Sequence, residues 1–143
     1  MHIAIGADHA GFSLKNQLVA HLERNGHQLR DVGTDSTESV DYPDFAQRVA
    51  LLVADQRVER GVLICGTGLG MDMTANKVRG VRCARCTSEY DARFARLHND
   101  ANVLALGARV TGAGLAESIV DTFLSTTFEA GRHARRVAKI DAP

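Results

Sequence analysis

A glycine-rich turn carries the residue types best suited to proton transfer and anion binding. The turn is Cys65-Gly66-Thr67-Gly68-Leu69-Gly70, and it follows a short apolar run. Glycines let the backbone approach a ligand closely, and N–H groups at a helix start attract a phosphate or a developing oxyanion. A cysteine at the head of such a turn is favoured as a thiolate. Two interpretations are open: Cys65 is a reactive base, or it is a small buried core residue.

Acid–base side chains occur in two further segments. Asp8 and His9 directly follow the first apolar run and could handle hydroxyl protons and phosphate charge, although Asp8 is equally suited to cap a helix. His98-Asn99-Asp100 precedes a later apolar run, where we expect it to bring polar groups to the ligand edge of a sheet. A lone loop histidine is more often simply solvated.

Three arginines are candidates for binding a phosphate, because guanidinium forks match its oxygens. They are Arg109, Arg132 and Arg136; isolated arginines are usually surface residues, and we assign Arg135 to that class.

The pair in Cys83-Ala84-Arg85-Cys86 has the spacing of a metal or redox motif. We expect it on or beside a strand, where odd spacing sends the two side chains to opposite faces, and a second pair to complete a zinc site is missing. The glycine turn matches neither a dinucleotide fingerprint nor a Walker phosphate loop.

Short apolar runs alternate with amphipathic stretches, and this order must position the chemical groups. The strands are expected at 3–5, 27–32, 62–65, 81–84 and 103–106, with helices between them and a last long helix at 112–126, followed by a basic tail. Such alternation predicts an α/β fold: a Rossmann-like three-layer sandwich with a five-stranded parallel sheet, in a single domain over 1–143. Ligands bind such sheets at the carboxyl ends of the strands, so the turns after strands one and three are of first interest.

Composition limits the classes of function. The chain has 143 residues, 17 basic and 17 acidic, giving a formal net charge of +0. We therefore expect no general attraction to nucleic acid or to an anionic membrane, and any anion site must be local. Neither a signal peptide nor an apolar stretch of about 20 residues is visible. The three cysteines are expected to be free thiols in a reducing compartment, by default the cytoplasm.

Six motifs, spread in order over nearly the whole chain, resemble the type B ribose-5-phosphate isomerase family, which also contains galactose-6-phosphate isomerase subunits. They are Gly6-Ala7-Asp8-His9-Ala10-Gly11-Phe12, Asp41-Tyr42-Pro43-Asp44, Cys65-Gly66-Thr67-Gly68, Ala75-Asn76-Lys77, His98-Asn99-Asp100-Ala101-Asn102 and Gly131-Arg132-His133. The resemblance implies an aldose–ketose isomerase that interconverts ribose 5-phosphate and ribulose 5-phosphate through an enediolate, without a metal or other cofactor.

The resemblance also implies roles for individual residues. Cys65 would be the base, Thr67 and the N–H groups of Gly66, Gly68 and Gly70 would stabilise the enediolate, and His98, with Asp8, would open the furanose ring. Asn76 and Asn99 would hold sugar hydroxyls, Tyr42 would line the pocket, and His9, Arg109, Arg132 and Arg136 would bind the phosphate. The site would be shared in a homodimer or tetramer, with His98, Asn99 and Arg109 acting on the neighbour's Cys65 and the tail 127–143 packing on a partner subunit.

Some alternatives remain open at this stage. Asp72 stands where the family commonly has serine, so a carboxylate near Cys65 could raise the pKa of the thiol or select another sugar. Erythrulose 4-phosphate, allose 6-phosphate and galactose 6-phosphate are therefore alternative substrates. A non-catalytic phosphate- or nucleotide-binding module, or a redox or zinc protein built on Cys83 and Cys86, is a less favoured alternative.

Overall fold

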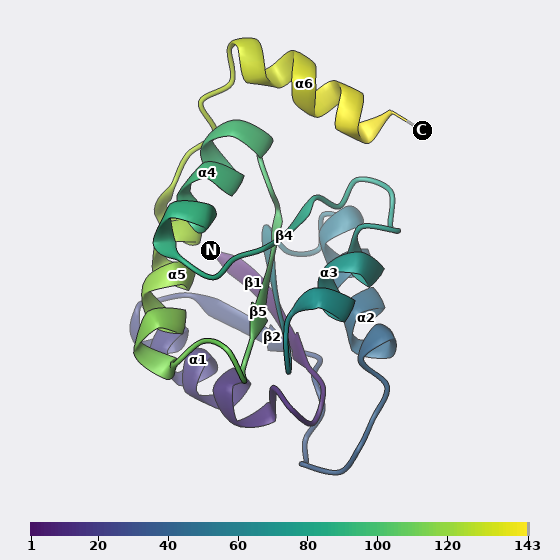
Figure 1. Ribbon diagram of the computed structural model, residues 1–143, viewed down its shortest axis with the longest axis vertical. Helices are drawn as coiled ribbons and strands as arrows, with labels where there is room; N and C mark the ends of the chain where they lie inside the picture. Colours follow the sequence, from purple (N-terminus) through teal and green to yellow (C-terminus); the bar gives the residue numbers. More distant parts are fainter. Residues whose placement is uncertain (143) are drawn as a thin grey trace.

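The computed structural model describes residues 1–142 and consists of a parallel sheet between two helical layers (Figure 1). Its strands are β1 (His2–Ala7), β2 (Gln28–Asp31), β3 (Arg60–Cys65), β4 (Cys83–Arg85) and β5 (Val103–Gly107), in the spatial order β2-β1-β3-β5-β4. Its helices are α1 (Phe12–Arg24), α2 (Tyr42–Ala54), α3 (Leu69–Ala75), α4 (Glu89–Asn99), α5 (Ala113–Ser125) and α6 (Arg132–Asp141). The predicted α/β fold with five parallel strands is confirmed.

The alternation of side chains along β3 divides the core into two layers. Val62 and Ile64 pack with α1, α4 and α5, whereas Leu63 and Cys65 pack with α2 and α3. Successive strand residues point to opposite faces of a sheet, so this division follows directly from the strand's period of two. Cys65 therefore lies on the face that α3 covers, at the point where that helix is about to begin.

The chain leaves β1 and β3 toward opposite faces of the sheet. These two strands are neighbours, and α1 follows β1 on one side while α3 follows β3 on the other (Figure 1). Divergence of two adjacent connections opens a crevice at the carboxyl ends of the strands, the usual ligand position in doubly wound sheets. The fold thus directs attention to the same two turns that the sequence singled out.

The segment before β5 is a correction to the sequence-based expectation. We expected His98-Asn99-Asp100 at the carboxyl edge of the sheet, where ligands bind. Parallel strands all begin at the other edge, the amino edge, so residues that precede a strand lie there. β5 starts at Val103, which pairs with Gly61 near the start of β3, so the loop 100–102 lies at the amino edge. Cys65 ends β3 at the carboxyl edge, and four residues of rise along β5 separate the two levels by about 13 Å.

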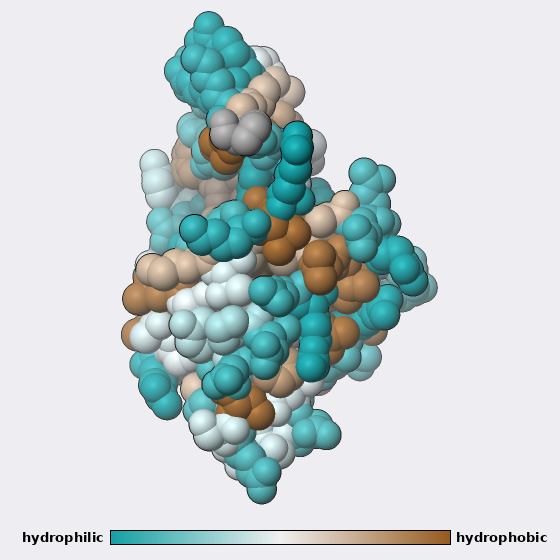
Figure 2. All heavy atoms as spheres, turned by 90° about the vertical axis from the view of Figure 1, so that its right-hand side faces the viewer, coloured by the Kyte–Doolittle hydropathy of each residue, from teal (hydrophilic) through white to brown (hydrophobic). Residues whose placement is uncertain are grey.

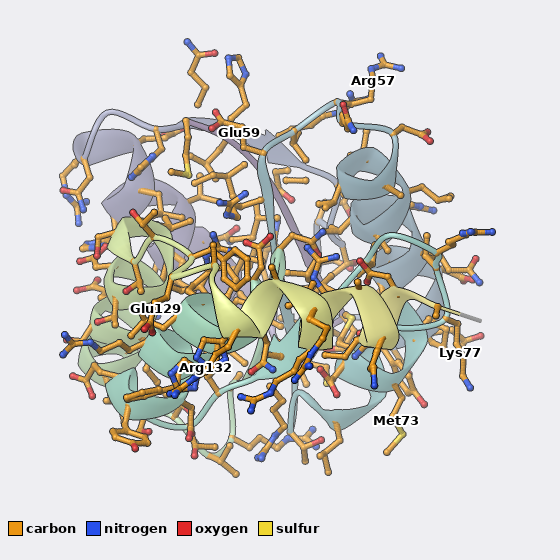
Figure 3. All side chains as sticks on the ribbon, turned by 90° about the horizontal axis from the view of Figure 1, so that it is seen from above. Arg57, Glu59, Met73, Lys77, Glu129 and Arg132 are labelled. Atoms are coloured by element: carbon orange, nitrogen blue, oxygen red, sulfur yellow. The ribbon has the colours of Figure 1, made fainter. Side chains whose placement is uncertain are left out.

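The basic tail contains a helix that the sequence analysis did not identify. In α6, His133 and Val137 are buried, and their spacing of four places both on the face that meets α4. The helix lies above the amino edge of the sheet and stands apart from the main body (Figure 1). Seen from above, it crosses the molecule from the side of Glu129 and Arg132 toward the side of Lys77 (Figure 3). Of the predicted tail 127–143, residue 143 lies outside the described residues.

Candidate active site

A pocket of about 340 Å³ opens at the carboxyl ends of β1 and β3. It brings together the turn after β1, the glycine turn after β3, the start of α2 and the end of β5. The lining residues are Asp8, His9, Ala10, Tyr42, Cys65, Gly66, Thr67, Gly70 and Arg109, and all but Ala10 were proposed from the sequence. The two turns expected to face each other do so.

Cys65 lies at the boundary between the core and this pocket. Only 5% of the residue is exposed, and its Sγ accepts a hydrogen bond from the Gly68 N–H at 3.1 Å. Gly68 precedes α3 with a φ of 79°, a left-handed conformation that glycine adopts without strain. Within residues 1–142, the backbone N–H groups of Gly66 and Thr67 have no hydrogen-bond acceptor. Two donors are thus free beside a sulfur that lines a pocket.

Asp8 closes the turn between β1 and α1. Its Oδ1 accepts hydrogen bonds from Ala10 N at 3.0 Å and from Gly11 N at 3.1 Å. The turn is tight, because a Cβ added at Gly11 would lie 2.5 Å from the Ile64 carbonyl oxygen. Asp8 therefore does not cap α1, whose N-cap is Gly11; its carboxylate closes the preceding turn, and the residue also lines the pocket.

His9 is held in one orientation by the loop that precedes α2. Its Nδ1 accepts a hydrogen bond from Val40 N at 3.2 Å, and a nitrogen that accepts carries no proton. In the neutral ring the proton is therefore assigned to Nε2. This tautomer makes Nε2–H the donor that His9 can offer to a ligand.

The aromatic wall of the pocket depends on a glycine. A Cβ added at Gly70 would lie 2.4 Å from Cε2 of Tyr42 and 2.6 Å from its Cζ. Only a glycine on the first turn of α3 lets the Tyr42 ring take this position. Tyr42 remains 41% exposed, so its ring covers the glycine turn without closing the pocket.

Arg109 supplies a positive charge to the pocket of its own chain. Its backbone N–H donates to Gly66 O at 3.0 Å, and a Cβ added at Gly66 would lie 3.0 Å from its Nη1. The side chain is exposed and forms no ion pair with residues 1–142. The resemblance had assigned Arg109 to the neighbour's pocket; this expectation is corrected, since the residue lies beside Cys65 of the same chain.

Besides Asn76, which faces β4, four predicted site residues lie away from this pocket. His98 and Asn99 end α4 at the amino edge of the sheet, and Arg132 and Arg136 are exposed on α6. A single chain therefore does not bring these groups to Cys65.

His98 takes part in a contact between α4 and α6. Its ring stacks on His133, with centroids 4.0 Å apart and planes 11° apart, and its Nε2 lies 3.7 Å from Glu129 Oε2. Burial and the neighbouring His98 lower the pKa of His133. These three side chains are near enough to be considered as metal ligands. A lone pair of imidazole lies in the ring plane, however, so two parallel stacked rings cannot both point at one ion.

Asp72 on α3 and Asn76, directly after this helix, face β4 instead of the pocket. Asn76 accepts from Cys83 N at 2.8 Å and donates to Cys83 O at 3.0 Å, which occupies both ends of its amide. Burial raises the pKa of Asp72, while hydrogen bonds from the Cys83 thiol and the Arg85 backbone partly offset this. The Asp72 carboxylate, expected to act on Cys65, raises the pKa of the Cys83 thiol, after the larger effect of burial.

The cysteine pair is divided between the two layers of the core, as its spacing predicted. Cys83 packs on the α2 and α3 side and Cys86 on the α1, α4 and α5 side, and both are free thiols. Burial, Asp91 and Asp72 raise the pKa of Cys86 to about 12. Neither thiol has the character of a redox or metal-binding group.

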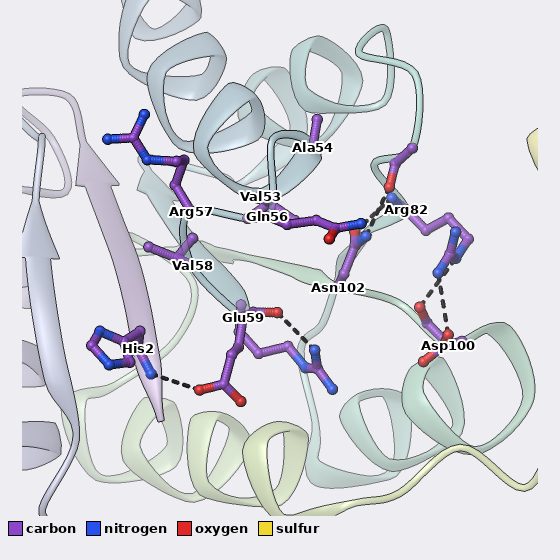
Figure 4. Close-up of a pocket in the computed structure, with 12 residues that line it drawn as sticks. His2, Val53, Ala54, Gln56, Arg57, Val58, Glu59, Arg82, Asp100 and Asn102 are labelled. Atoms are coloured by element: carbon purple, nitrogen blue, oxygen red, sulfur yellow. Dashed lines mark hydrogen bonds and ion pairs between the residues drawn. The ribbon is translucent and has the colours of Figure 1, made fainter.

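A larger pocket of about 630 Å³ at the amino edge is less suited to a phosphate (Figure 4). Arg82 is already paired there with Asp100 at 3.2 Å and with Asp141 at 2.9 Å. The Asn102 amide bonds Gly80 O and Arg82 N, both at 2.8 Å. The carboxyl ends of α2 and α4 also lie at this edge, and their partial negative charge disfavours an anion.

One residue near the site was missed by the sequence analysis. Arg85 ends β4 at the carboxyl edge, and its Nε donates to Thr67 O at 2.6 Å. The rule that ligand groups follow the carboxyl ends of strands could have identified it. It was considered only as part of the cysteine motif.

The fold is a doubly wound domain, and its site holds a thiol, a histidine and an arginine around a glycine turn. Together they define an enzyme that acts on an anionic substrate. The model of the ribose/galactose isomerase family matches residues 3–140. Ribose-5-phosphate isomerase B of Escherichia coli is 51% identical over 140 residues, covering 98% of this chain and 94% of that protein. This chain belongs to the ribose/galactose isomerase family and is a sugar-phosphate isomerase, which confirms the resemblance found in the sequence.

Solved structures agree with this assignment. The ribose-5-phosphate isomerase B of Clostridium thermocellum superposes with a TM-score of 0.98 at 53% identity, covering 99% of this chain and 95% of that one. The Mycoplasma genitalium enzyme of the same name, with ribulose 5-phosphate bound, gives a TM-score of 0.95 at 44% identity, covering 98% and 93%. In the described part of this chain, helices long and apolar enough to cross a membrane are not found.

Proposed function

We propose that this chain interconverts ribose 5-phosphate and ribulose 5-phosphate through an enediolate, with the Cys65 thiolate as the base. One observation carries the proposal: Cys65 lines a pocket of about 340 Å³ together with Arg109 and next to free backbone donors. The similarity to ribose-5-phosphate isomerase B of Escherichia coli supports the choice of substrate. The ribulose 5-phosphate bound to the Mycoplasma genitalium enzyme supports it further.

The proton transfer needs one base and an oxyanion site. The Cys65 thiolate removes the proton from C2 of the open-chain aldose, and the electron pair moves to form the enediolate, with negative charge on the C1 oxygen. The proton of the C2 hydroxyl passes to the C1 oxygen, and the Cys65 thiol returns its proton to C1, which yields the ketose and regenerates the thiolate. The free N–H groups of Gly66 and Thr67 are the donors available to the oxyanion, and one such donor contributes about 3 kcal/mol.

Binding of the phosphate falls to the cationic and donor groups at the pocket mouth. The Nε2–H of His9 and the guanidinium of Arg109 are two side-chain donors that line the pocket and can donate to phosphate oxygens. Tyr42 borders the remaining space for the sugar. The aldose must first open its ring, which requires a proton transfer. We propose that Asp8, on one side of the pocket, assists this transfer.

The other half of the site comes, in our proposal, from a second copy of the chain. His98, Asn99, Arg132 and Arg136 lie at the edge opposite to Cys65, so they can act on a sugar only across a subunit contact. In a homodimer, or a tetramer built from it, His98 of one subunit would assist ring opening at the Cys65 of the other. Segment 127–143 would form part of the contact.

The surface below α6 is suited to such a contact. Pockets of about 440 Å³ and 230 Å³ lie between the end of α6 and the region of α3 and β4. Ile140 on α6 is 55% exposed and Met73 on α3 is 64% exposed. The space-filling view from this side shows apolar atoms gathered at mid-height below α6 (Figure 2). Exposed apolar groups of this kind mark association surfaces.

The test of the reaction is a panel of phosphosugars assayed with purified protein in the presence of EDTA. We expect the highest kcat/KM for ribose 5-phosphate, unchanged by the chelator, and a loss of at least about 10³-fold in the Cys65→Ala protein. Arg24→Met serves as a control, since Arg24 is exposed on the far end of α1. Undiminished turnover by Cys65→Ala would remove the proposed base. The family name also includes galactose, so a strong preference for a hexose phosphate would change the proposed substrate but not the proposed reaction.

The shared site has its own test. Cys65→Ala and His98→Asn proteins are inactive alone in this proposal, but a mixed dimer holds one complete site. Unfolding and refolding the two together should restore activity at about a quarter of the sites. A mixture with no more activity than its parts would place His98 outside the neighbour's site.

The three free thiols favour a reducing compartment, and we propose the cytoplasm.

A further inference from the structure

The glycine turn is held from outside by an arginine on the edge strand. Arg85 ends β4, and its Nε donates to the Thr67 carbonyl oxygen at 2.6 Å. A hydrogen bond from a charged donor is shorter and about twice as strong as a neutral one. The guanidinium therefore fixes the direction of this carbonyl more firmly than a water molecule would.

The Thr67 carbonyl and the Gly68 N–H belong to one peptide unit. The peptide bond between Thr67 and Gly68 is trans, so the two groups point in opposite directions from a single plane. The Gly68 N–H donates to Cys65 Sγ at 3.1 Å. A donor on the carbonyl side polarises the peptide and strengthens the hydrogen bond on its N–H side. Arg85 and Cys65 thus occupy the two ends of one hydrogen-bonded peptide.

The surroundings keep this peptide in place. A Cβ added at Gly107 would lie 2.6 Å from the Thr67 carbonyl carbon and 2.7 Å from its oxygen, so the peptide lies directly on the end of β5. From the other side, the Asn76 amide bonds both backbone groups of Cys83 and fixes β4 against α3. Arg85 is therefore anchored to the same helix that the glycine turn begins.

We propose that Arg85 is a positioning residue for Cys65: its guanidinium fixes the Thr67–Gly68 peptide so that the Gly68 N–H donates to the sulfur. The inference rests on the proposed role of Cys65 as the base. Arg85 does not line the pocket and makes no contact with the substrate in this arrangement. Its loss should therefore affect the reactivity of the thiol and kcat more than substrate binding.

The experiment measures thiol reactivity and turnover separately. Arg85→Met removes the donor and the charge, Arg85→Lys keeps the charge without the Nε–H, and Arg24→Met controls for loss of an arginine elsewhere. The rate of Cys65 alkylation by iodoacetamide is followed against pH by mass spectrometry, and kcat and KM are measured for ribose 5-phosphate. Thermal melting of each variant verifies folding, and Arg85→Lys is decisive should Arg85→Met not fold.

For Arg85→Met we expect kcat to fall about tenfold, KM to change less than about threefold, and the midpoint of the alkylation profile to rise by about half a pH unit. Arg85→Lys should keep the loss of kcat and show a smaller shift of the midpoint. A wild-type kcat and midpoint in both variants would overturn the proposal, as would a change in KM alone. Alkylation does not require turnover, so a shifted midpoint in a protein that fails to isomerise any sugar would refute the function and leave the role of Arg85 intact.

Discussion

Substitution of Gly68 by alanine tests how closely the glycine turn is built around Cys65. The residue has a φ of 79°, and an added Cβ would lie 3.0 Å from the Leu106 carbonyl carbon and 3.2 Å from Gly107 N. Both neighbours are backbone atoms of β5, which cannot move aside as a side chain could. The turn itself must therefore shift, and with it the N–H that donates to the Cys65 sulfur.

Two other glycines separate the cost of the left-handed conformation from the cost of this contact. Gly26 and Gly80 both have a φ of 85°, and an added Cβ would meet nothing within 4 Å at either. For these controls we expect a loss of about 1 kcal/mol, since the strain of 1–2 kcal/mol is partly offset by the stiffer unfolded chain. Gly68→Ala should lose a further ~1–3 kcal/mol from overpacking, about 2–4 kcal/mol in total.

The assays are thermal melting and steady-state kinetics. At roughly 3 °C per kcal/mol for a chain of this size, Tm should fall by about 3 °C in the controls and by about 6–12 °C in Gly68→Ala. Because the displaced N–H is part of the thiol site, kcat should fall about 10–100-fold in Gly68→Ala and stay unchanged in the controls. A Gly68→Ala protein as stable and active as Gly26→Ala would refute this account of the turn.

Three further outcomes are expected. Gly70→Ala should displace the Tyr42 ring and raise KM about tenfold with little change in Tm, and an unchanged KM would separate that ring from the pocket. Iodoacetamide near pH 7.5 should modify Cys65, which lines the pocket, and leave Cys86 intact, because the pKa of Cys86 is raised to about 12; peptide mapping that finds Cys86 alkylated first would contradict this raised pKa. Burial lowers the pKa of His133 in the folded chain. Between this lowered pKa and the ordinary pKa of histidine, the unfolded state therefore binds more protons than the folded state. Its contribution to stability is complete above about pH 6.5 and is lost as the pH falls through the lowered pKa. The fall in Tm on acidification should be smaller in His133→Phe, and an identical fall would assign the effect to other groups.

Local pattern was sufficient for much of the fold. The apolar run ending in Cys65 gave its strand, since a period of two and a following glycine turn admit few other structures. The alternation of strands and helices then led to a parallel sheet, and the rule for carboxyl ends selected the turns after β1 and β3. The helix α6 was missed because only His133 and Val137 of it are buried, and its periodicity is carried by charged residues at helical spacing more than by apolar ones.

Position across the sheet could not be read from the residue types. The residue types of His98 and Asn99 do not indicate which edge of the sheet they occupy. Only the direction of the strands shows that they lie away from Cys65. Arg109 and Arg132 are likewise indistinguishable as sequence features, yet one lies over Gly66 and the other on the far side of the molecule.

The sequence by itself determined the family, the fold class and the identity of the groups able to move a proton, because these depend on residue types in a fixed order. The tertiary structure decided which of those groups meet. It assigned Arg109 to the pocket of its own chain, turned Asp72 toward Cys83, and set Arg85 on the peptide that faces Cys65. Contacts of this kind join residues from different strands, so they are fixed by the order and direction of strands in the sheet and not by spacing along the chain.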